Sequence, residues 1–205
     1  VPTERLQPVY EPSQKLRSNA TRLVVGAGTG FNAAALFQTP AGFHVGTGEC
    51  GHSTLPVETE DELRLWNYLA LNRGRASVER ALSGSGLKEI HEWYCLEQGL
   101  SPRDLSPAEI AERANSGSDP LCVCAARQWV TFLGRVIGDL SLVFLSLGGI
   151  VLTGGVTRSL ARFLAEPEFI NAFCAKGRQQ KLVSGIPVHL LDDDFAALAG
   201  CASRM

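Results

Sequence analysis

Three closely spaced glycines follow the first short apolar segment of the chain, in the order Gly26-Ala27-Gly28-Thr29-Gly30. Glycines adopt positive φ and let the backbone approach a ligand, and successive inward-pointing N–H groups form a nest that binds anions. The Thr29 hydroxyl adds a donor, so the loop is chemically suited to phosphate. It is not a P-loop, because Phe31-Asn32 stand where Lys-Ser or Lys-Thr is required. A dinucleotide-binding loop and a tight turn without a ligand remain open alternatives.

A second candidate group lies on the glycine-rich segment Gly46-Thr47-Gly48-Glu49-Cys50-Gly51-His52. Glu49 and His52 are three residues apart on a loop, so both side chains can face one pocket. Carboxylates accept hydrogen bonds from polyol hydroxyls, and imidazole accepts or donates. No zinc motif such as His-Glu-x-x-His is present, and we predict no metal site. A solvated charge at Glu49 and a packing role for His52 are the alternatives.

Glu79 is the third candidate, because it stands on a short predicted helix just before the turn Ser83-Gly84-Ser85-Gly86. On local grounds it is equally a partner in an exposed salt bridge, which contributes little to stability. The cysteines are a weaker signal. Their spacing is irregular, and Cys122-Val123-Cys124 lies in a strongly apolar stretch, so we predict buried thiols rather than metal ligands.

These candidates are positioned by short strands and turns near the start of the chain. Residues 22–25 predict a buried strand, and residues 31–37 and 43–46 predict a hairpin around an intervening Pro and Gly. A hairpin directly after Gly30 would exclude a dinucleotide-binding loop, which opens a helix. Residues 1–20 contain three prolines and lack strong periodicity, which indicates a polar lead-in.

The rest of the chain predicts helices with two further strands. Ser106-Pro107-Ala108-Glu109 has the pattern of a helix N-cap, and Gly148-Gly149 is expected to end a long helix. Strands are expected at 150–153 and 186–191, and helices at 61–71, 76–84, 87–98, 107–115, 120–147, 158–165, 167–176 and 194–203. This order predicts an α/β fold with a mixed sheet.

The composition is that of a folded globular chain, with 205 residues of which 45% are hydrophobic and 20% charged. A net charge of −2 gives no basic field for a nucleic acid, so no nucleic-acid partner is expected. The longest apolar run, 140–153, is too short to span a membrane, and the first residues do not resemble a signal peptide. The irregular spacing of the cysteines argues against a disulfide framework, and reduced cysteines fit a cytoplasmic protein. Because the chain does not begin with Met, we expect it to be processed or part of a longer protein.

Four motifs in the same order resemble those of the bacterial-type glucokinase family, in the sugar kinase and actin superfamily. The glycine loop at 26–30 resembles its second phosphate loop, and Gly48-Glu49-Cys50-Gly51-His52 resembles its Gly-Glu-Gly-Gly-His sugar motif. Residues 77–84 resemble its Ser-x-Glu-Arg-x-Leu-Ser-Gly motif, and residues 151–156 resemble its adenosine motif. The resemblance covers nearly the whole chain.

The resemblance implies a ribonuclease-H-like mixed sheet, three antiparallel strands followed by parallel ones, flanked by helices. It implies that residues 21–205 form the C-terminal sugar- and nucleotide-binding domain and that 1–20 are a remnant of the inter-domain region. Glucose would be the substrate, ATP and Mg²⁺ the cofactors, and a homodimer the assembly. The implied glucose-binding residues are Glu49, His52 and Glu79. The implied nucleotide-binding residues are Gly26, Gly28, Thr29, Gly30, Gly154 and Gly155.

The sequence departs from the family pattern in three ways. Cys50 stands where the family has Gly, and Phe31-Asn32 where it has Leu-Gly, so the ligand surface is expected to differ. The family's Asp-x-Gly-Gly-Thr loop and its Asn-Asp pair, whose Asp is the catalytic base, have no counterpart here, so we assign no catalytic residue. We therefore expect part of an ATP-dependent glucokinase with weak or no activity alone. A sugar-binding regulatory relative without catalysis is the alternative.

Overall fold

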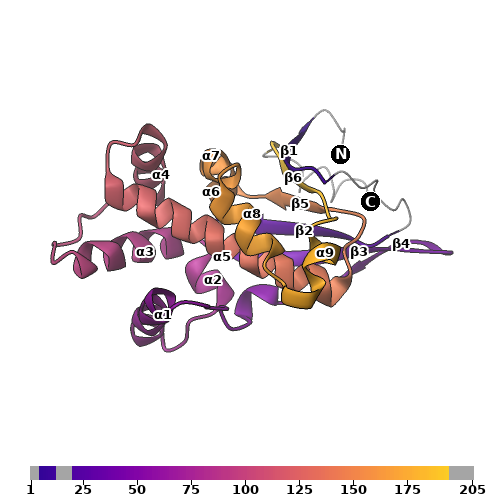
Figure 1. The fold of residues 1–205 in the computed structure, drawn as a ribbon, viewed down its shortest axis with the longest axis horizontal. Helices are drawn as coiled ribbons and strands as arrows, with labels where there is room; N and C mark the ends of the chain where they lie inside the picture. Colours follow the sequence, from indigo (N-terminus) through magenta and orange to yellow (C-terminus); the bar gives the residue numbers. More distant parts are fainter. Residues whose placement is uncertain (1–4, 13–19, 194–205) are drawn as a thin grey trace.

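A six-stranded mixed sheet forms the centre of the computed structural model, which describes residues 5–12 and 20–193 (Figure 1). The predicted helix at 194–203 lies outside the described residues. The strand order is β1-β6-β5-β2-β3-β4. The strands are β1 (Leu6–Tyr10), β2 (Arg22–Ala27), β3 (Phe31–Thr39), β4 (Gly42–Gly46), β5 (Ile150–Thr153) and β6 (Val188–Leu191).

The pairing of the strands confirms the predicted mixed sheet. β2, β3 and β4 form an antiparallel meander, and β5 runs parallel to both β2 and β6. β1 was not predicted, because it lies in residues 1–20, which were expected to be a polar lead-in without strong periodicity. It pairs antiparallel with β6 at the edge of the sheet, with Leu6 opposite Leu191 and a register shift after Pro8. Its partial exposure and its proline explain why no period-two pattern revealed it.

Helices cover the sheet and extend beyond it on the side away from β4 (Figure 1). The helix predicted at 158–165 is divided into α6 and α7 and begins earlier, at Gly155. The helix predicted at 76–84 is reduced to α2. The helices are α1 (Glu60–Arg73), α2 (Val78–Ala81), α3 (Gly84–Glu97), α4 (Pro107–Ser116), α5 (Pro120–Phe144), α6 (Gly155–Ser159), α7 (Ala161–Leu164), α8 (Pro167–Cys174) and α9 (Gln180–Val183), with 3₁₀ turns η2 (Cys50–His52) and η3 (Gly177–Gln179).

The long helix α5 ends earlier than the sequence predicted. Leu145 adopts a left-handed conformation with φ of 47° and closes the helix, so Gly148-Gly149 lie beyond its end. Gly148 serves a packing purpose instead, because a Cβ there would lie 2.5 Å from the Ala20 carbonyl oxygen. A glycine pair is typical of helix ends, which is why the helix was predicted to extend to it. Here Gly148 is needed for its contact with Ala20 instead, so the prediction of the helix end was wrong.

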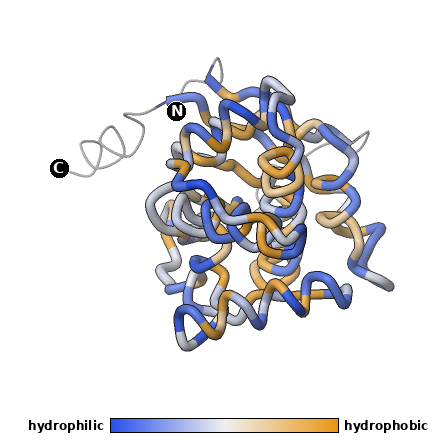
Figure 2. Tube along the Cα trace, turned by 90° about the vertical axis from the view of Figure 1, so that its left-hand side faces the viewer, coloured by the Kyte–Doolittle hydropathy of each residue, from blue (hydrophilic) through white to orange (hydrophobic). Residues whose placement is uncertain are grey.

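The core forms around α5, which is apolar on most of its surface. Trp129 and Phe132 are fully buried, and α8 packs closely against α5. Gly134 allows this approach, because a Cβ there would lie 2.4 Å from the carbonyl oxygen of Phe169. Much of the inner trace in Figure 2 is accordingly hydrophobic. Within residues 5–12 and 20–193, none of the helices combines the length and apolarity that a membrane crossing needs.

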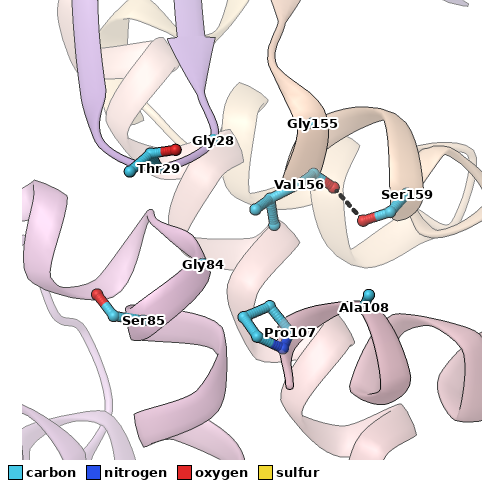
Figure 3. Close-up of a pocket in the computed structure, with 9 residues that line it drawn as sticks. All are labelled: Gly28, Thr29, Gly84, Ser85, Pro107, Ala108, Gly155, Val156 and Ser159. Carbon is cyan, nitrogen blue, oxygen red and sulfur yellow. Dashed lines mark hydrogen bonds between the residues drawn. The ribbon is translucent and has the colours of Figure 1, made fainter.

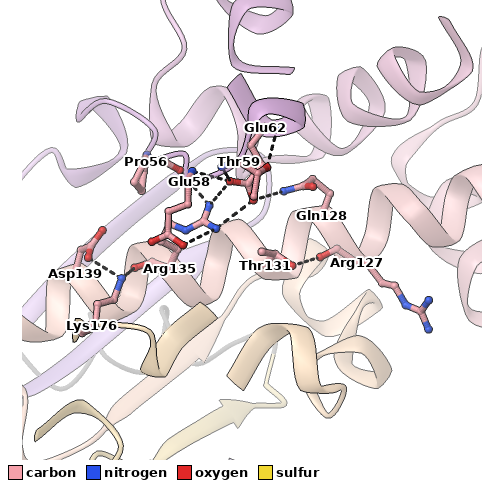
Figure 4. A network of polar contacts seen from close by, with 10 residues as sticks. All are labelled: Pro56, Glu58, Thr59, Glu62, Arg127, Gln128, Thr131, Arg135, Asp139 and Lys176. Carbon is pink, nitrogen blue, oxygen red and sulfur yellow. Dashed lines mark hydrogen bonds and ion pairs between the residues drawn. The ribbon is translucent and has the colours of Figure 1, made fainter. Parts of the chain in front are cut away.

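A buried ion pair connects α1 to α5 (Figure 4). The Arg135 guanidinium donates to both carboxylate oxygens of Glu62, at 2.9 and 3.1 Å, and both side chains are only 6% exposed. The Glu62 carboxylate also accepts from the Glu58 amide at 2.8 Å. Burial by itself would raise the pKa of Glu62, but this amide and Arg135 outweigh it and hold the pKa below its ordinary value.

Candidate sugar and nucleotide site

An open cavity of about 600 Å³ lies where two loops of the sheet meet the first turns of α3 and α4 (Figure 3). The loops follow β2 and β5, the two central parallel strands. Sites in open α/β sheets commonly lie beyond the carboxyl ends of such strands. The lining residues are Gly28, Thr29, Gly84, Ser85, Pro107, Ala108, Gly155, Val156 and Ser159.

The glycine loops that follow β2 and β5 pack against each other at the carboxyl ends of these strands. Gly154 has φ of 109°, and a Cβ there would lie 2.2 Å from the Ala27 carbonyl oxygen, so only glycine can occupy it without rearrangement. The buried Thr157 hydroxyl donates to the same oxygen at 3.1 Å. A Cβ on Gly28 would lie 3.4 Å from the Gly155 nitrogen. The cavity wall is thus built from backbone atoms at close range.

Two helix N-termini complete this wall. Gly84, the first residue of α3, donates its amide to the Gly28 carbonyl oxygen at 2.8 Å, and Ser83 caps the helix through the Gly86 amide. Pro107 opens α4 after the predicted capping box, which the structure confirms. The N-terminal turn of a helix carries unpaired amides and a partial positive charge. The arrangement therefore favours a phosphate group in the cavity.

Glu49 and His52 lie at the two ends of η2. The His52 Nε2 is 3.9 Å from the Glu49 Oε2, and their side chains are 66% and 78% exposed respectively. Both groups are consequently open to a ligand from solvent. The segment after them is fixed by strand-like pairing, since the Val78 amide donates to the Ser53 carbonyl oxygen at 2.9 Å. This pairing places η2 beside α2, which carries Glu79.

Glu79 is half-buried between the start of β3 and η2. Its Oε2 accepts a hydrogen bond from the Phe31 amide at 2.9 Å. Gly51 packs against the same place, because a Cβ there would lie 2.2 Å from the Phe31 carbonyl oxygen and 3.3 Å from the Glu79 Cβ. The elements that carry the three predicted sugar residues therefore meet at the start of β3.

The six predicted nucleotide residues divide into two sets. Gly28, Thr29 and Gly155 line the cavity. The other three stand beside it: Gly26 pairs with Thr153 inside the sheet, and Gly154 packs on Ala27.

Gly30 is the third predicted nucleotide residue that does not line the cavity, and it faces the Glu79 carboxylate. A Cβ there would lie 2.6 Å from the Glu79 Oε2, so the end of the glycine loop at 26–30 is in contact with the carboxylate. Six further lining residues were not predicted, among them Ser85, Ala108 and Ser159. The helix starts at 84 and 107 were visible as cap patterns, but their meeting in space was not.

Asn32, a departure from the family pattern, holds the backbone of the segment that carries Glu49 and His52. Its Nδ2 donates to the Gly48 carbonyl oxygen at 2.8 Å, and its Oδ1 accepts from the Cys50 amide at 3.1 Å. The other departure, Cys50, is sterically tolerated: Leu145 is the one described non-glycine residue with positive φ, so Cys50 needs no glycine-type backbone. Burial raises the pKa of the Cys50 thiol.

The dinucleotide-binding alternative is wrong. β3 begins directly after Gly30 and pairs with β2 as a hairpin, with Ala27 opposite Phe31. A dinucleotide fingerprint needs a helix at this point.

The family of this chain follows from its similarity to known proteins. The family model described as Glucokinase matches residues 3–205, so the chain belongs to the glucokinase family. The glucokinase of Nitrobacter hamburgensis is 38% identical over 180 residues, covering 88% of this chain and 56% of that protein. The chain therefore spans about half the length of this relative.

Solved structures agree with the fold. A glucokinase from an Antarctic psychrotroph superposes with a TM-score of 0.90 at 28% identity, over 100% of this chain and 63% of the other. A ROK family glucokinase from Streptomyces griseus in complex with glucose and AMPPNP gives a TM-score of 0.59 at 16% identity, over 92% and 61%. The chain thus has the fold of sugar kinases, as the resemblance implied.

Proposed function

We propose that this chain forms the sugar- and nucleotide-binding part of an ATP-dependent glucokinase, which phosphorylates glucose to glucose 6-phosphate. The observation that carries the proposal is the contact between Gly30 and the Glu79 carboxylate, which joins the predicted sugar residues to the phosphate loop. Phosphoryl transfer depends mainly on positioning and electrostatic stabilisation, so two adjacent sites are what the reaction needs. Residues 21–205 would be the C-terminal domain of that enzyme.

In this proposal the sugar is held by Glu49, His52 and Glu79. One oxygen of the Glu79 carboxylate is held by the Phe31 amide, which fixes its orientation, and the other accepts a sugar hydroxyl. Charge-assisted hydrogen bonds of this kind are stronger than neutral ones. The exposed side chains of Glu49 and His52 supply further acceptors and a donor from the opposite loop.

The nucleotide would place its phosphates against Gly28, Thr29 and the first turn of α3, with Gly155 bordering the rest of the molecule. Support comes from the close-packed backbone wall and from the AMPPNP held by the Streptomyces griseus fold neighbour. No carboxylate is among the nine lining residues, so they offer Mg²⁺ no protein ligand of the usual kind. When bound with ATP, Mg²⁺ would neutralise phosphate charge.

We assign the proton abstraction from the 6-hydroxyl to no residue of this chain. The family's Asn-Asp pair has no match in the sequence, and we expect the catalytic Asp to come from a segment equivalent to the N-terminal half of the relatives. Homodimer formation and a cytoplasmic location are proposed from the family resemblance.

Titration calorimetry with glucose tests the sugar site directly. We expect saturable binding by the chain and a loss of at least tenfold in affinity for Glu79→Gln, because the neutral amide replaces a charged acceptor. Glu112→Gln is the matched control, since Glu112 is exposed on α4 outside the site. Equal affinity in both variants would remove Glu79 from the sugar site.

A coupled glucose-phosphorylation assay tests the division of labour. The chain alone should show weak or no turnover, and the N-terminal half of the Nitrobacter hamburgensis relative, supplied in trans or fused, should restore it. Rapid turnover by the chain alone would contradict the proposed origin of the catalytic Asp. Glucose binding that never leads to turnover in the fused protein would favour a regulatory sugar-binding protein.

A further inference from the structure

A second group of chemically reactive side chains lies away from the cavity, between α3 and the start of α5. His91, Asp119 and Cys122 each offer a ligand atom, and these atoms lie within 4.8 Å of one another. The three residues are 1%, 6% and 0% exposed. The sequence predicts Cys122 only as a buried thiol, and no local pattern connects it with the other two residues.

The unpaired state of His91 distinguishes this cluster from ordinary packing. Its Nδ1 is fully buried and has no hydrogen-bond partner. Leaving such an atom unsatisfied is destabilising. A neutral imidazole carries one lone pair, and the unpartnered Nδ1 is the atom at which a cation can bind.

Cys95 contacts the His91 ring from its other side. It lies one helical turn after His91 on α3, and its Sγ is 3.7 Å from the His91 Nε2, so Nδ1 is the ring nitrogen left without a partner. From these observations the geometry points to a zinc site formed by His91, Asp119 and Cys122.

The donor set selects the ion. Imidazole and thiolate ligands favour Zn²⁺ in tetrahedral sites, whereas Mg²⁺ and Ca²⁺ require oxygen ligands. Asp119 can contribute without losing its role at the start of α5. Its Oδ1 accepts from the Leu121 and Cys122 amides, and its Oδ2 pairs with Arg103, whose side chain is 61% exposed and can turn to solvent.

Binding would exchange protons for the ion. Zn²⁺ binds cysteine as the thiolate, so the Cys122 thiol would release its proton to solvent as the ion binds. The ion would join α3 to α5, and α3 supplies Gly84 and Ser85 to the cavity wall. The site would therefore stabilise the framework of the nucleotide cavity without taking part in chemistry.

The direct test measures metal content and affinity with zinc itself. The purified chain, dialysed against Zn²⁺ and then metal-free buffer, should retain one ion per chain by native mass spectrometry, and its thermal unfolding midpoint should fall in chelator. Cys122→Ser should weaken binding at least tenfold, whereas Cys124→Ser, two residues along the same helix and outside the cluster, should not. Retention by Cys122→Ser, or equal losses in both variants, would overturn the site.

A measurement on the unmodified chain covers the case in which Cys122→Ser does not fold. Zn²⁺ should protect Cys122 from alkylation under mild denaturation while Cys50 and Cys124 still react, as read by peptide mass mapping. Co²⁺ should give the absorption of a tetrahedral thiolate complex. Uniform alkylation with and without zinc, or an octahedral cobalt spectrum, would refute the proposal.

Discussion

The nucleotide and sugar sides of the proposed site are built on different principles. The nucleotide wall consists of backbone atoms and helix starts that pack within van der Waals distance, as the Gly154 and Ala27 contact shows. The sugar side presents side chains, Glu49 and His52, that are mostly exposed on a short turn. A backbone wall forms only if the fold forms, whereas exposed side chains contribute little to folding. We therefore expect changes on the first side to cost stability and changes on the second to cost affinity.

The largest effect on stability is expected outside both sides, at the buried ion pair between Glu62 of α1 and Arg135 of α5. Glu62→Gln removes the buried carboxylate from Arg135 and leaves it only the more exposed Glu58 carboxylate at 3.2 Å, so it should lower the free energy of unfolding by about 3 kcal/mol. Urea unfolding measures it, with Glu60→Gln on the exposed face of the same helix as the control. Equal unfolding midpoints would show that the pair contributes nothing.

The same pair predicts an acid dependence. The folded pKa of Glu62 is lower than its ordinary value of 4.5, so its stabilisation is complete above about pH 4.5 and is lost as the pH falls through the folded pKa. The stability difference between the unmodified chain and Glu62→Gln should shrink over this acid range. A difference that stays constant would contradict the assignment.

The next effect tests the backbone wall. Gly154→Ala forces a side chain into a left-handed backbone and against the Ala27 carbonyl, and should destabilise the chain by about 2–4 kcal/mol. Gly155→Ala is the matched control, because a Cβ there meets nothing within 4 Å and should leave the unfolding midpoint nearly unchanged. Comparable losses in both variants would remove the distinction between the two glycines.

The sugar side should respond in the opposite way. Asn32→Ala removes the two hydrogen bonds that hold the Gly48 and Cys50 backbone, and should weaken glucose binding about five- to tenfold with little change in stability. ATP affinity should be unaltered, and Asn67→Ala on the exposed face of α1 should change neither. Calorimetry with both ligands decides this. A parallel loss of ATP binding would show that the two sides are not separable.

The smallest effect is expected for Cys50→Gly, which restores the family residue. The backbone there does not require glycine, so the change should lower stability by less than about 1 kcal/mol through added unfolded-state freedom. Thermal unfolding measures it. A gain in stability would indicate strain at Cys50.

Local patterns predicted most of the fold, and tertiary contacts account for the rest. The capping box at Ser106 and the hairpin after Gly30 depend on neighbouring residues, and both were found. β1 was missed because its register is set by β6, far along the chain. The end of α5 was predicted too late for the same reason. Gly148 is required by its close contact with the Ala20 carbonyl oxygen and not by the end of the helix.

The candidate site was predictable to a similar extent. Gly28 and Thr29 were found because glycine loops carry a local signal. Ser85, Ser159 and the bracing role of Asn32 were not, because each depends on which segments meet in space. The cluster of His91, Asp119 and Cys122 was missed for this reason too, because its side chains come from α3 and from the start of α5.

The central claim is that sugar and nucleotide bind side by side on this chain, joined at Gly30 and Glu79. A crystal structure of the chain with glucose and AMPPNP tests it most directly. We predict sugar hydroxyls on the carboxylates of Glu49 and Glu79, and phosphates against Gly28 and Thr29. Density for the sugar on another face, or phosphates away from this loop, would contradict the account.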